Sequence, residues 1–246
     1  MTATLLNSLL RALLRWGAAL VFCLPLRHRP HFWARACGML LPLLLLAQLL
    51  DPLAQSTTLW QQQLLLLVLY VSFFALLGGM IYLCTDINKK GSLYCAVWSL
   101  LIAQCAYEGW CFLELQFTRH GHPLNMASPW AVLVQLLSGA VFFAAVYILL
   151  ARQLPYKGEY HIGPRQLFSA FFIGILFMVQ AAVLDNARAE HTPLSLTVTI
   201  LIGQFYFITL LYFQSELFKK SAMEKEMNEL NLLYERQRQQ YQVARQ

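Results

Sequence analysis

The residues best suited to chemistry in this sequence are polar side chains set inside long apolar segments. Glu108 lies near the middle of such a segment, with Gln104 one helical turn before it and Glu114 nearer the far end. Burying a carboxylate in hydrocarbon is costly unless it is paired or neutralised, so we expect Glu108 to face the inside of a helix bundle. Three polar residues of later apolar segments could face it there: Gln135, Gln180 and Gln204.

Two interpretations of these polar residues fit the sequence. The first is a pocket, open to the outside, that binds a ligand or a proton. Its predicted ligand-binding residues are Gln104, Glu108, Glu114 and Gln180. The second is a set of interhelical hydrogen bonds that fixes the packing of the helices.

Catalytic and metal-binding patterns are weak elsewhere in the sequence. His120 and His122 together with Glu114 could hold a metal ion, but two ligands around Gly121 in a loop are a poor site. The sequence contains no nucleophile-elbow, zinc-protease or nucleotide-binding signature. The six cysteines form no CxxC pair and are interpreted as small buried hydrophobic residues. We therefore predict no catalytic residues, metal or cofactor, and no enzymatic activity for this chain by itself.

The composition is that of a membrane protein. Hydrophobic residues make up 59% of the chain and charged residues 12%, about half the charged share of a soluble domain. Apolar stretches of about 20 residues, the length that crosses a bilayer, occur seven times. They lie near residues 5–26, 32–50, 62–84, 93–115, 130–151, 166–185 and 195–217. These stretches predict an all-α, polytopic membrane bundle over residues 1–218, with about seven spans.

The first of these stretches has an alternative interpretation. Arg11 and Arg15 lie inside it, one helical turn apart. A helix with two arginines on one face could instead lie in the membrane interface, with the arginines among the lipid headgroups.

The basic residues in the short loops predict the orientation of the bundle. The first, third and fifth loops hold eight: Arg27, Arg29, Arg35, Lys89, Lys90, Arg152, Lys157 and Arg165. The even loops hold only Arg119 and Arg188. Because Lys and Arg collect on the cytoplasmic side, the odd loops and the C-terminus should be cytoplasmic and the N-terminus outside. The net charge of +6 is thus explained by topology in a cell (plasma) membrane, without a nucleic-acid partner.

Residues 219–246 differ from everything before them. No Gly or Pro separates Leu211 from the end of the chain, so the last apolar helix should continue into water. Apolar residues with coiled-coil spacing follow: Met223, Met227, Leu230, Tyr234 and Tyr241. They predict a cytoplasmic signalling helix that forms a parallel homodimer. The alternative is a single solvated helix with ion pairs such as Lys220–Glu224.

Two segments resemble the membrane sensor region of Agr-type sensor histidine kinases, which carry a GHKL-type ATPase domain. The first segment is CTDINKKGSLYCAVWSLLIAQCAY, and the second is MNELNLLYERQRQQYQVARQ. The positions that match are Asp86, Ile87, Leu93, Tyr94, Cys95 and Gln104. Many members of the family have a His after that Gln, where this chain has Cys105. In the family, the second segment leads into a phosphoacceptor box and the ATPase domain, neither of which occurs in these residues.

The resemblance implies a two-component signal sensor that passes an extracytoplasmic or intramembrane stimulus through its last helix to a cytoplasmic kinase module or response-regulator system. The short outer loops favour a peptide or small apolar ligand that enters the bundle. The alternative is a small multi-spanning transporter or channel with a regulatory tail. A transporter should show internal repeats, and the sequence shows no such symmetry.

Overall fold

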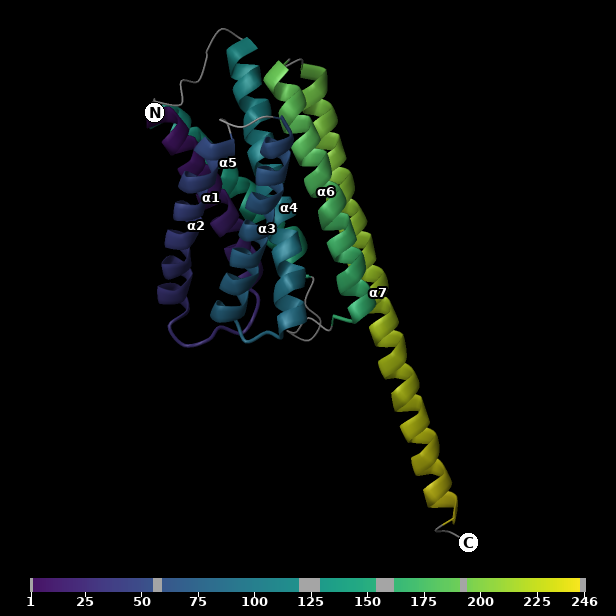
Figure 1. The fold of residues 1–246 in the computed structure, drawn as a ribbon. Helices are drawn as coiled ribbons and strands as arrows, with labels where there is room; N and C mark the ends of the chain where they lie inside the picture. Colours follow the sequence, from purple (N-terminus) through teal and green to yellow (C-terminus); the bar gives the residue numbers. More distant parts are fainter. Residues whose placement is uncertain (1, 55–58, 120–128, 154–161, 191–193, 244–246) are drawn as a thin grey trace.

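The computed structural model describes residues 2–54, 59–119, 129–153, 162–190 and 194–243. These residues form seven α-helices and no extended strand (Figure 1). The helices are α1 (Thr2–Cys23), α2 (Phe32–Ala54), α3 (Leu59–Cys84), α4 (Lys89–Arg119), α5 (Pro129–Val146), α6 (Pro164–Glu190) and α7 (Leu194–Val243). A π-helical turn, η1 (Tyr147–Ala151), extends α5. The all-helical fold predicted from the sequence is therefore confirmed.

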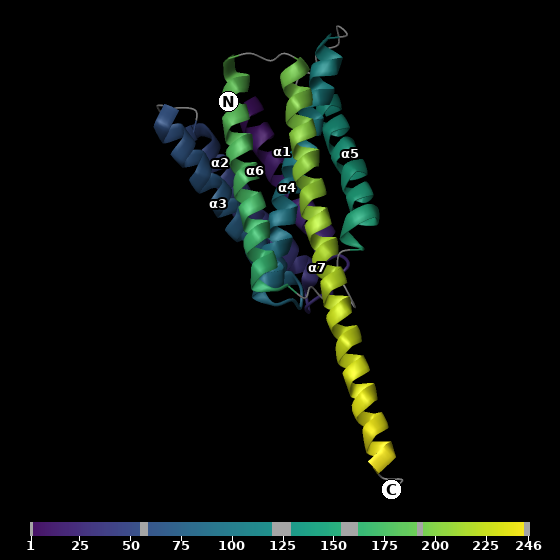
Figure 2. The same cartoon turned by 90° about the vertical axis from the view of Figure 1, so that its right-hand side faces the viewer.

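The helices alternate in direction along one bundle axis, and α4 is the helix around which the others pack (Figures 1 and 2). It contacts α1, α3, α5, α6 and α7. Every residue from Tyr94 to Ala106 on α4 is buried. A helix that is apolar on all sides belongs in the interior of a bundle, and this composition explains the central place of α4.

Small residues bring α1 close to its neighbours. Ala12, Ala18 and Ala19 are fully buried, which allows the backbones of adjacent helices to approach closely. Phe22 of α1 then packs against Trp98 of α4, with ring centroids 6.0 Å apart. Because α1 packs on α2, α3, α4 and α5, it is part of the bundle. The structure thus contradicts the alternative of a separate amphipathic helix at the interface.

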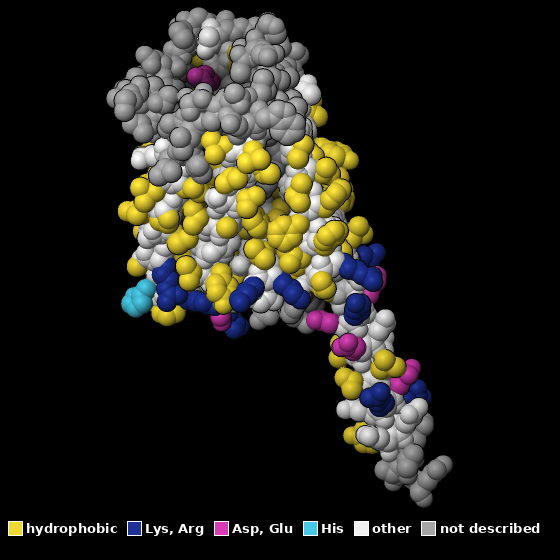
Figure 3. Space-filling view, in the orientation of Figure 1, with side chains coloured by type: hydrophobic (Ala, Val, Ile, Leu, Met, Phe, Trp, Pro, Cys, Tyr) yellow, Lys and Arg dark blue, Asp and Glu magenta, His cyan; other side chains and the backbone are white. Residues whose placement is uncertain are grey.

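The outer surface of the bundle is strongly apolar. Figure 3 shows a broad belt of hydrophobic side chains above a band of Lys and Arg at the end from which α7 extends. Within the described residues, three segments are long and apolar enough to cross a membrane: Leu67–Cys84, Lys89–Thr118 and Trp130–Ala151. These three candidate spans favour a membrane protein. The count of seven spans goes beyond them and stays a prediction.

Helix α7 is one uninterrupted helix of 50 residues. Its first part packs on α4 and α6, and its C-terminal part extends away from the bundle (Figure 1). This continuity agrees with the absence of Gly and Pro after Leu211. At 1.5 Å per residue, α7 is about 75 Å long.

The start of α4 is fixed by a side-chain cap. Asn88 precedes the helix, and its Oδ1 accepts a hydrogen bond from the backbone N–H of Gly91 at 2.7 Å. This bond satisfies one of the N–H groups that lack a partner in the first turn of a helix. A Cβ atom at position 91 would lie 2.6 Å from Ile87 Cδ1, so a larger residue there requires the Ile87 side chain to shift.

We predict that Asn88→Ala lowers the free energy of unfolding by about 1 kcal/mol, because the first turn of α4 loses its cap. Asn88→Asp should keep most of the stability, since its carboxylate accepts the same hydrogen bond. Unfolding of the purified protein in mild detergent, followed by circular dichroism, measures both effects. Equal losses in the two variants would show that the cap does not stabilise α4.

Candidate functional site

The interior of the bundle holds a hydrogen-bonded pair on α4. Gln104 Nε2 donates to Glu108 Oε1 at 3.0 Å, and Glu108 is only 2% exposed. Both side chains are buried, so the pair lies inside the bundle. The sequence prediction that Glu108 faces the bundle interior is correct.

Two arginines of α1 point into the bundle as well. Arg11 Nη2 donates to the hydroxyl of Tyr107, and its guanidinium lies 4.2 Å from the centre of that ring. Arg15 is buried, with its guanidinium 3.9 Å from the ring centre of Phe73 on α3. Cation–π contacts of this kind stabilise a buried guanidinium. The arginines do not mark a surface helix; they bring positive charge to the level of Tyr107 and Glu108.

Gln135 of α5 lies at the same level. Helices α1 and α5 run in the same direction, and a Cβ on Gly139 would lie 3.0 Å from Leu14 Cδ2. Gln135 is one turn before Gly139, and Arg11 is about one turn before Leu14. Gln135 is 1% exposed, and neither atom of its amide has a hydrogen-bond partner among the described residues.

Gln204 reaches this level from α7. The hydroxyl of Tyr94 lies near Ser215, which fixes the register of the antiparallel helices α4 and α7. Eleven residues before Ser215 lies Gln204, and ten residues after Tyr94 lies Gln104, a rise of about 15 Å on each helix. Gln204 is buried, and its Oε1 has no hydrogen-bond partner among the described residues.

Together, these side chains form a polar layer across four helices. We define the polar layer as Arg11, Gln104, Tyr107, Glu108, Gln135 and Gln204. Leaving buried polar atoms without partners costs about 1–3 kcal/mol per group. Both amide atoms of Gln135 and the Oε1 of Gln204 are buried polar atoms of this kind among the described residues. The layer has both a charged and a neutral component.

The other two predicted ligand-binding residues lie further from the pair. Gln180 is half-buried on α6, and its amide lies against Gly203 of α7. A Cβ atom at position 203 would clash with this amide. Glu114 is half-buried and lies six residues after Glu108, a rise of about 9 Å towards the end of the bundle opposite the tail. The structure thus brings Gln104 and Glu108 together, whereas Gln180 belongs to the α6–α7 contact and Glu114 to the outer end of α4.

A second buried polar cluster holds α7 to its neighbours near the point where it leaves the bundle. Gln214 Nε2 donates to the backbone oxygen of Gln166 at 3.1 Å and to the hydroxyl of Ser169, both on α6. The Tyr94 hydroxyl of α4 lies beside Gln166 and Ser215. The sequence analysis missed this cluster. Its only signal was the pair Gln214-Ser215 at the end of an apolar run.

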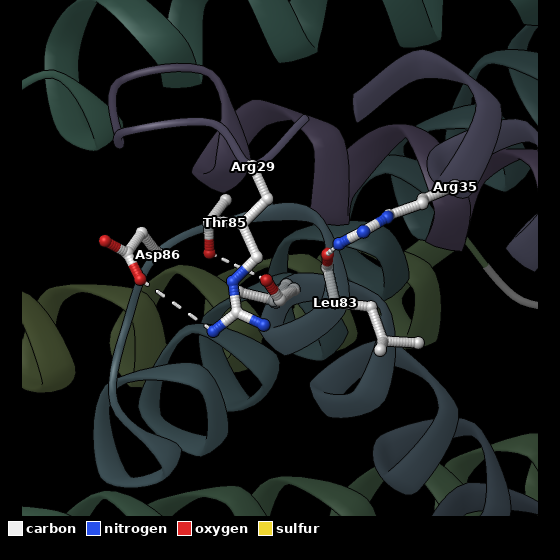
Figure 4. A network of polar contacts seen from close by, with 6 residues as sticks. Arg29, Arg35, Leu83, Thr85 and Asp86 are labelled. Atoms are coloured by element: carbon white, nitrogen blue, oxygen red, sulfur yellow. Dashed lines mark hydrogen bonds and ion pairs between the residues drawn. The ribbon is translucent and has the colours of Figure 1, made fainter. Parts of the chain in front are cut away.

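The loops at the same end of the bundle are joined by a charged contact network (Figure 4). Arg29 Nη2 lies 3.9 Å from Asp86 Oδ1, and Arg35 Nη1 donates to the backbone oxygen of Leu83 at 2.8 Å. Figure 4 shows both arginines reaching from the α1–α2 side towards the end of α3. These contacts tie the two helical hairpins α1–α2 and α3–α4 together.

Backbone hydrogen bonds reinforce this loop contact. His28 and Thr85 form an isolated antiparallel bridge, and the N–H of Asp86 donates to the oxygen of Arg27 at 2.9 Å. Asp86 is one of the positions that carry the family resemblance. Its surroundings give it a structural role, because its backbone and carboxylate both bind the preceding loop.

The predicted dimerisation residues lie on the part of α7 that leaves the bundle. Met223, Met227, Leu230, Tyr234 and Tyr241 are all exposed. Four of the six cysteines are buried, in agreement with their interpretation as hydrophobic residues, whereas Cys37 is exposed and Cys111 half-buried. Within the described residues, no three His, Cys, Asp or Glu side chains gather as a metal site. His120 and His122 lie outside the described residues.

Comparison with known proteins gives no relative. No family model matches the chain, and neither the curated proteins nor the solved structures contain a match.

We predict that Glu108→Leu lowers the free energy of unfolding by about 1–3 kcal/mol, because the buried amide of Gln104 loses its acceptor. Glu108→Gln should cost less, since a side-chain oxygen remains at the same place. Urea unfolding in mild detergent, followed by tryptophan fluorescence, measures both variants.

The control is the double variant Gln104→Leu/Glu108→Leu, which removes both partners at once. It should be more stable than the sum of the single changes implies, since the two side chains are in contact. Additive effects would mean that the hydrogen bond contributes nothing to the fold.

Proposed function

We propose that this chain is the membrane-embedded sensor of a two-component signalling system. In this proposal the bundle detects an extracytoplasmic or intramembrane stimulus and α7 passes the change to a cytoplasmic kinase module outside these 246 residues. The chain itself does not transfer phosphate. No histidine follows His191, and the sequence has no Gly-rich nucleotide-binding segment.

The observation that carries the proposal is that one continuous helix, α7, contains both a residue of the polar layer and the exposed tail. Gln204 of the polar layer and Met223 of the exposed tail lie on α7, about 28 Å apart along its axis. No break in the helix separates them, so a shift or rotation of α7 at Gln204 moves the tail as well. A transporter does not need such a rigid extension.

The polar layer is the proposed place of the stimulus. Its buried amides at Gln135 and Gln204 can bind the polar atoms of a peptide, or the polar group of a small, mainly apolar ligand, that enters between the helices. Such a ligand would bind one arrangement of α4, α5 and α7 more tightly than another. Only a difference in affinity between two arrangements can move α7.

Seven membrane spans with a cytoplasmic C-terminus complete the proposal. Support comes from the band of Lys and Arg at the end of the bundle from which α7 extends (Figure 3). Basic residues collect on the cytoplasmic side of membrane proteins, and this placement puts the N-terminus outside. The resemblance to Agr-type sensor histidine kinases over Asp86, Ile87 and the residues after Met227 points to the same orientation.

The exposed stripe on α7 is the proposed contact between two copies of the chain. Met227, Leu230 and Tyr234 follow the 4–3 spacing of a parallel coiled coil. They are exposed in one copy, and pairing with a second copy would cover them.

We predict that cysteine at Leu230 or Tyr234 forms disulfide-linked dimers in membranes of a variant without the native cysteines. Cysteine at Glu229 or Arg236, which lie off the stripe, should crosslink far less. Non-reducing electrophoresis after mild oxidation measures the difference. Equal crosslinking at all four positions would mean that the tail has no defined dimer face.

The function itself is tested by adding an output domain. A GHKL-type kinase domain with its phosphoacceptor helix, fused after Gln246 in heptad register, should become labelled by radioactive ATP. Insertion of two residues at the junction rotates the domain by about 200° and should change the labelling at equal expression.

The unfused chain is the matched control and should stay unlabelled. Substitution of Gln204 by Leu in the fusion should alter its signal response while leaving dimer crosslinking unchanged. Labelling that is identical in both registers and in the Gln204 variant would exclude transmission through α7.

A further inference from the structure

The point where α7 leaves the bundle carries a cluster of basic residues from three helical elements. Lys219 of α7 donates to the backbone oxygen of Gln153, which follows η1, at 3.2 Å. Arg152 is the neighbour of Gln153, and Lys220 is the neighbour of Lys219. The end of η1 and the exit of α7 therefore bring three positive charges to one place.

A fourth basic residue comes from α6. Arg165 precedes Gln166, whose backbone oxygen accepts the hydrogen bond from Gln214. Gln214 is about one and a half turns before Lys220, so Arg165 lies near the same end of α7. We call Arg152, Arg165, Lys219 and Lys220 the basic collar.

Most of the charge of the basic collar is exposed. Arg152, Arg165 and Lys220 are all exposed, and Lys219 is half-buried. Among the described residues, Glu216 meets the collar, with its Oε1 3.8 Å from Lys219 Nζ. Glu224 lies one turn further along the tail from Lys220. The collar therefore keeps an excess of positive charge at the surface.

Large apolar side chains lie directly beside these charges on each element. Leu149 precedes Arg152 by three residues, Phe168 follows Arg165 by three, and Leu217 precedes Lys220 by three. All three are exposed, and the bundle carries a broad apolar belt next to its basic band (Figure 3). A soluble phosphate would use only the charges. A phospholipid uses both, because its acyl chains cover the belt while its headgroup meets the basic side chains.

We propose that the basic collar binds anionic phospholipid headgroups and so anchors the exit of α7 at the membrane surface. Clusters of Lys and Arg next to a membrane span attract anionic lipids, and each basic side chain contributes about a fivefold gain in affinity. The inference rests on the membrane placement in the proposed function and is independent of kinase output.

The consequence for the tail is mechanical. Lys219 is bound to Gln153 and lies one residue from Lys220, so a headgroup on the collar restrains α7 at the boundary between its packed and its free part. When α7 rotates, Lys219 and Lys220 must then either leave the headgroup or stay in place while the helix turns around this point. The lipid composition of the membrane thereby sets the resting position of the tail.

Native mass spectrometry of the whole chain tests the proposal. The protein is extracted into mild detergent with equal amounts of phosphatidylglycerol and phosphatidylcholine, and the lipid adducts are compared. The wild type should retain phosphatidylglycerol in preference. The triple variant Arg152→Gln/Arg165→Gln/Lys220→Gln should lose this preference by about a hundredfold, at a fivefold change per side chain.

A matched control removes the same charge from the tail, through Lys225→Gln/Arg236→Gln/Arg238→Gln, and should keep the wild-type preference. A second variant, Arg152→Lys/Arg165→Lys, keeps the charge and should keep the preference even if the Gln variant folds poorly. Equal retention of both lipids by the wild type, or equal loss in the collar and tail variants, would overturn the proposal. Displacement by an equal concentration of glycerol 3-phosphate would also overturn it, because the site would then recognise a soluble phosphate.

The lipid assay and the kinase fusion can fail separately. A fusion without regulated labelling leaves the lipid preference as a property of the bundle. A wild type without lipid preference leaves transmission through α7 to be judged by the fusion alone.

Discussion

Helix α4 has no free side over its central turns, and the rest of the structure follows from this constraint. Buried polar side chains are usually hydrogen-bonded, so those on α4 are expected to have partners on α4 itself or on a neighbouring helix. Glu108 meets this need through Gln104, and Tyr107 meets it through Arg11 of α1. The Arg11–Tyr107 hydrogen bond links α1 to α4, whereas the Gln104–Glu108 hydrogen bond lies within α4. The apolar residues around them supply the packing.

Buried polar residues also hold α7 in the bundle. Near its start, Gln204 lies buried at the level of Glu108, and further along, Gln214 bonds to α6. The C-terminal part of the helix extends away from the bundle (Figure 2). Helix α7 is thus packed into the bundle at Gln204 and hydrogen-bonded to α6 at Gln214. The basic collar lies at the boundary between the packed part and the free part of α7, so a restraint there acts on the whole tail.

Much of the fold could be predicted from periodicity and length. The seven apolar stretches correspond to seven helices, and the long tail helix follows from the lack of Gly and Pro after Leu211. The candidate site was only partly predictable. Glu108 and Gln104 are one turn apart on one helix, a relation that the sequence contains. The sequence does not show which of Gln135, Gln180 and Gln204 lies at the level of Glu108 along the bundle axis. The register between helices decides that comparison.

The sequence by itself determined the local properties of this protein: helical segments, their apolar character, the basic loops and the continuity of α7. These depend on residues close together in the chain, through hydrogen bonds and side-chain spacing of 3.6 residues per turn. Only the tertiary structure decided that Arg11 and Arg15 face the interior, and that Arg152 lies beside Lys219. Such relations arise from packing between helices distant in the sequence, where small residues such as Gly139 and Ala18 set the approach and the register.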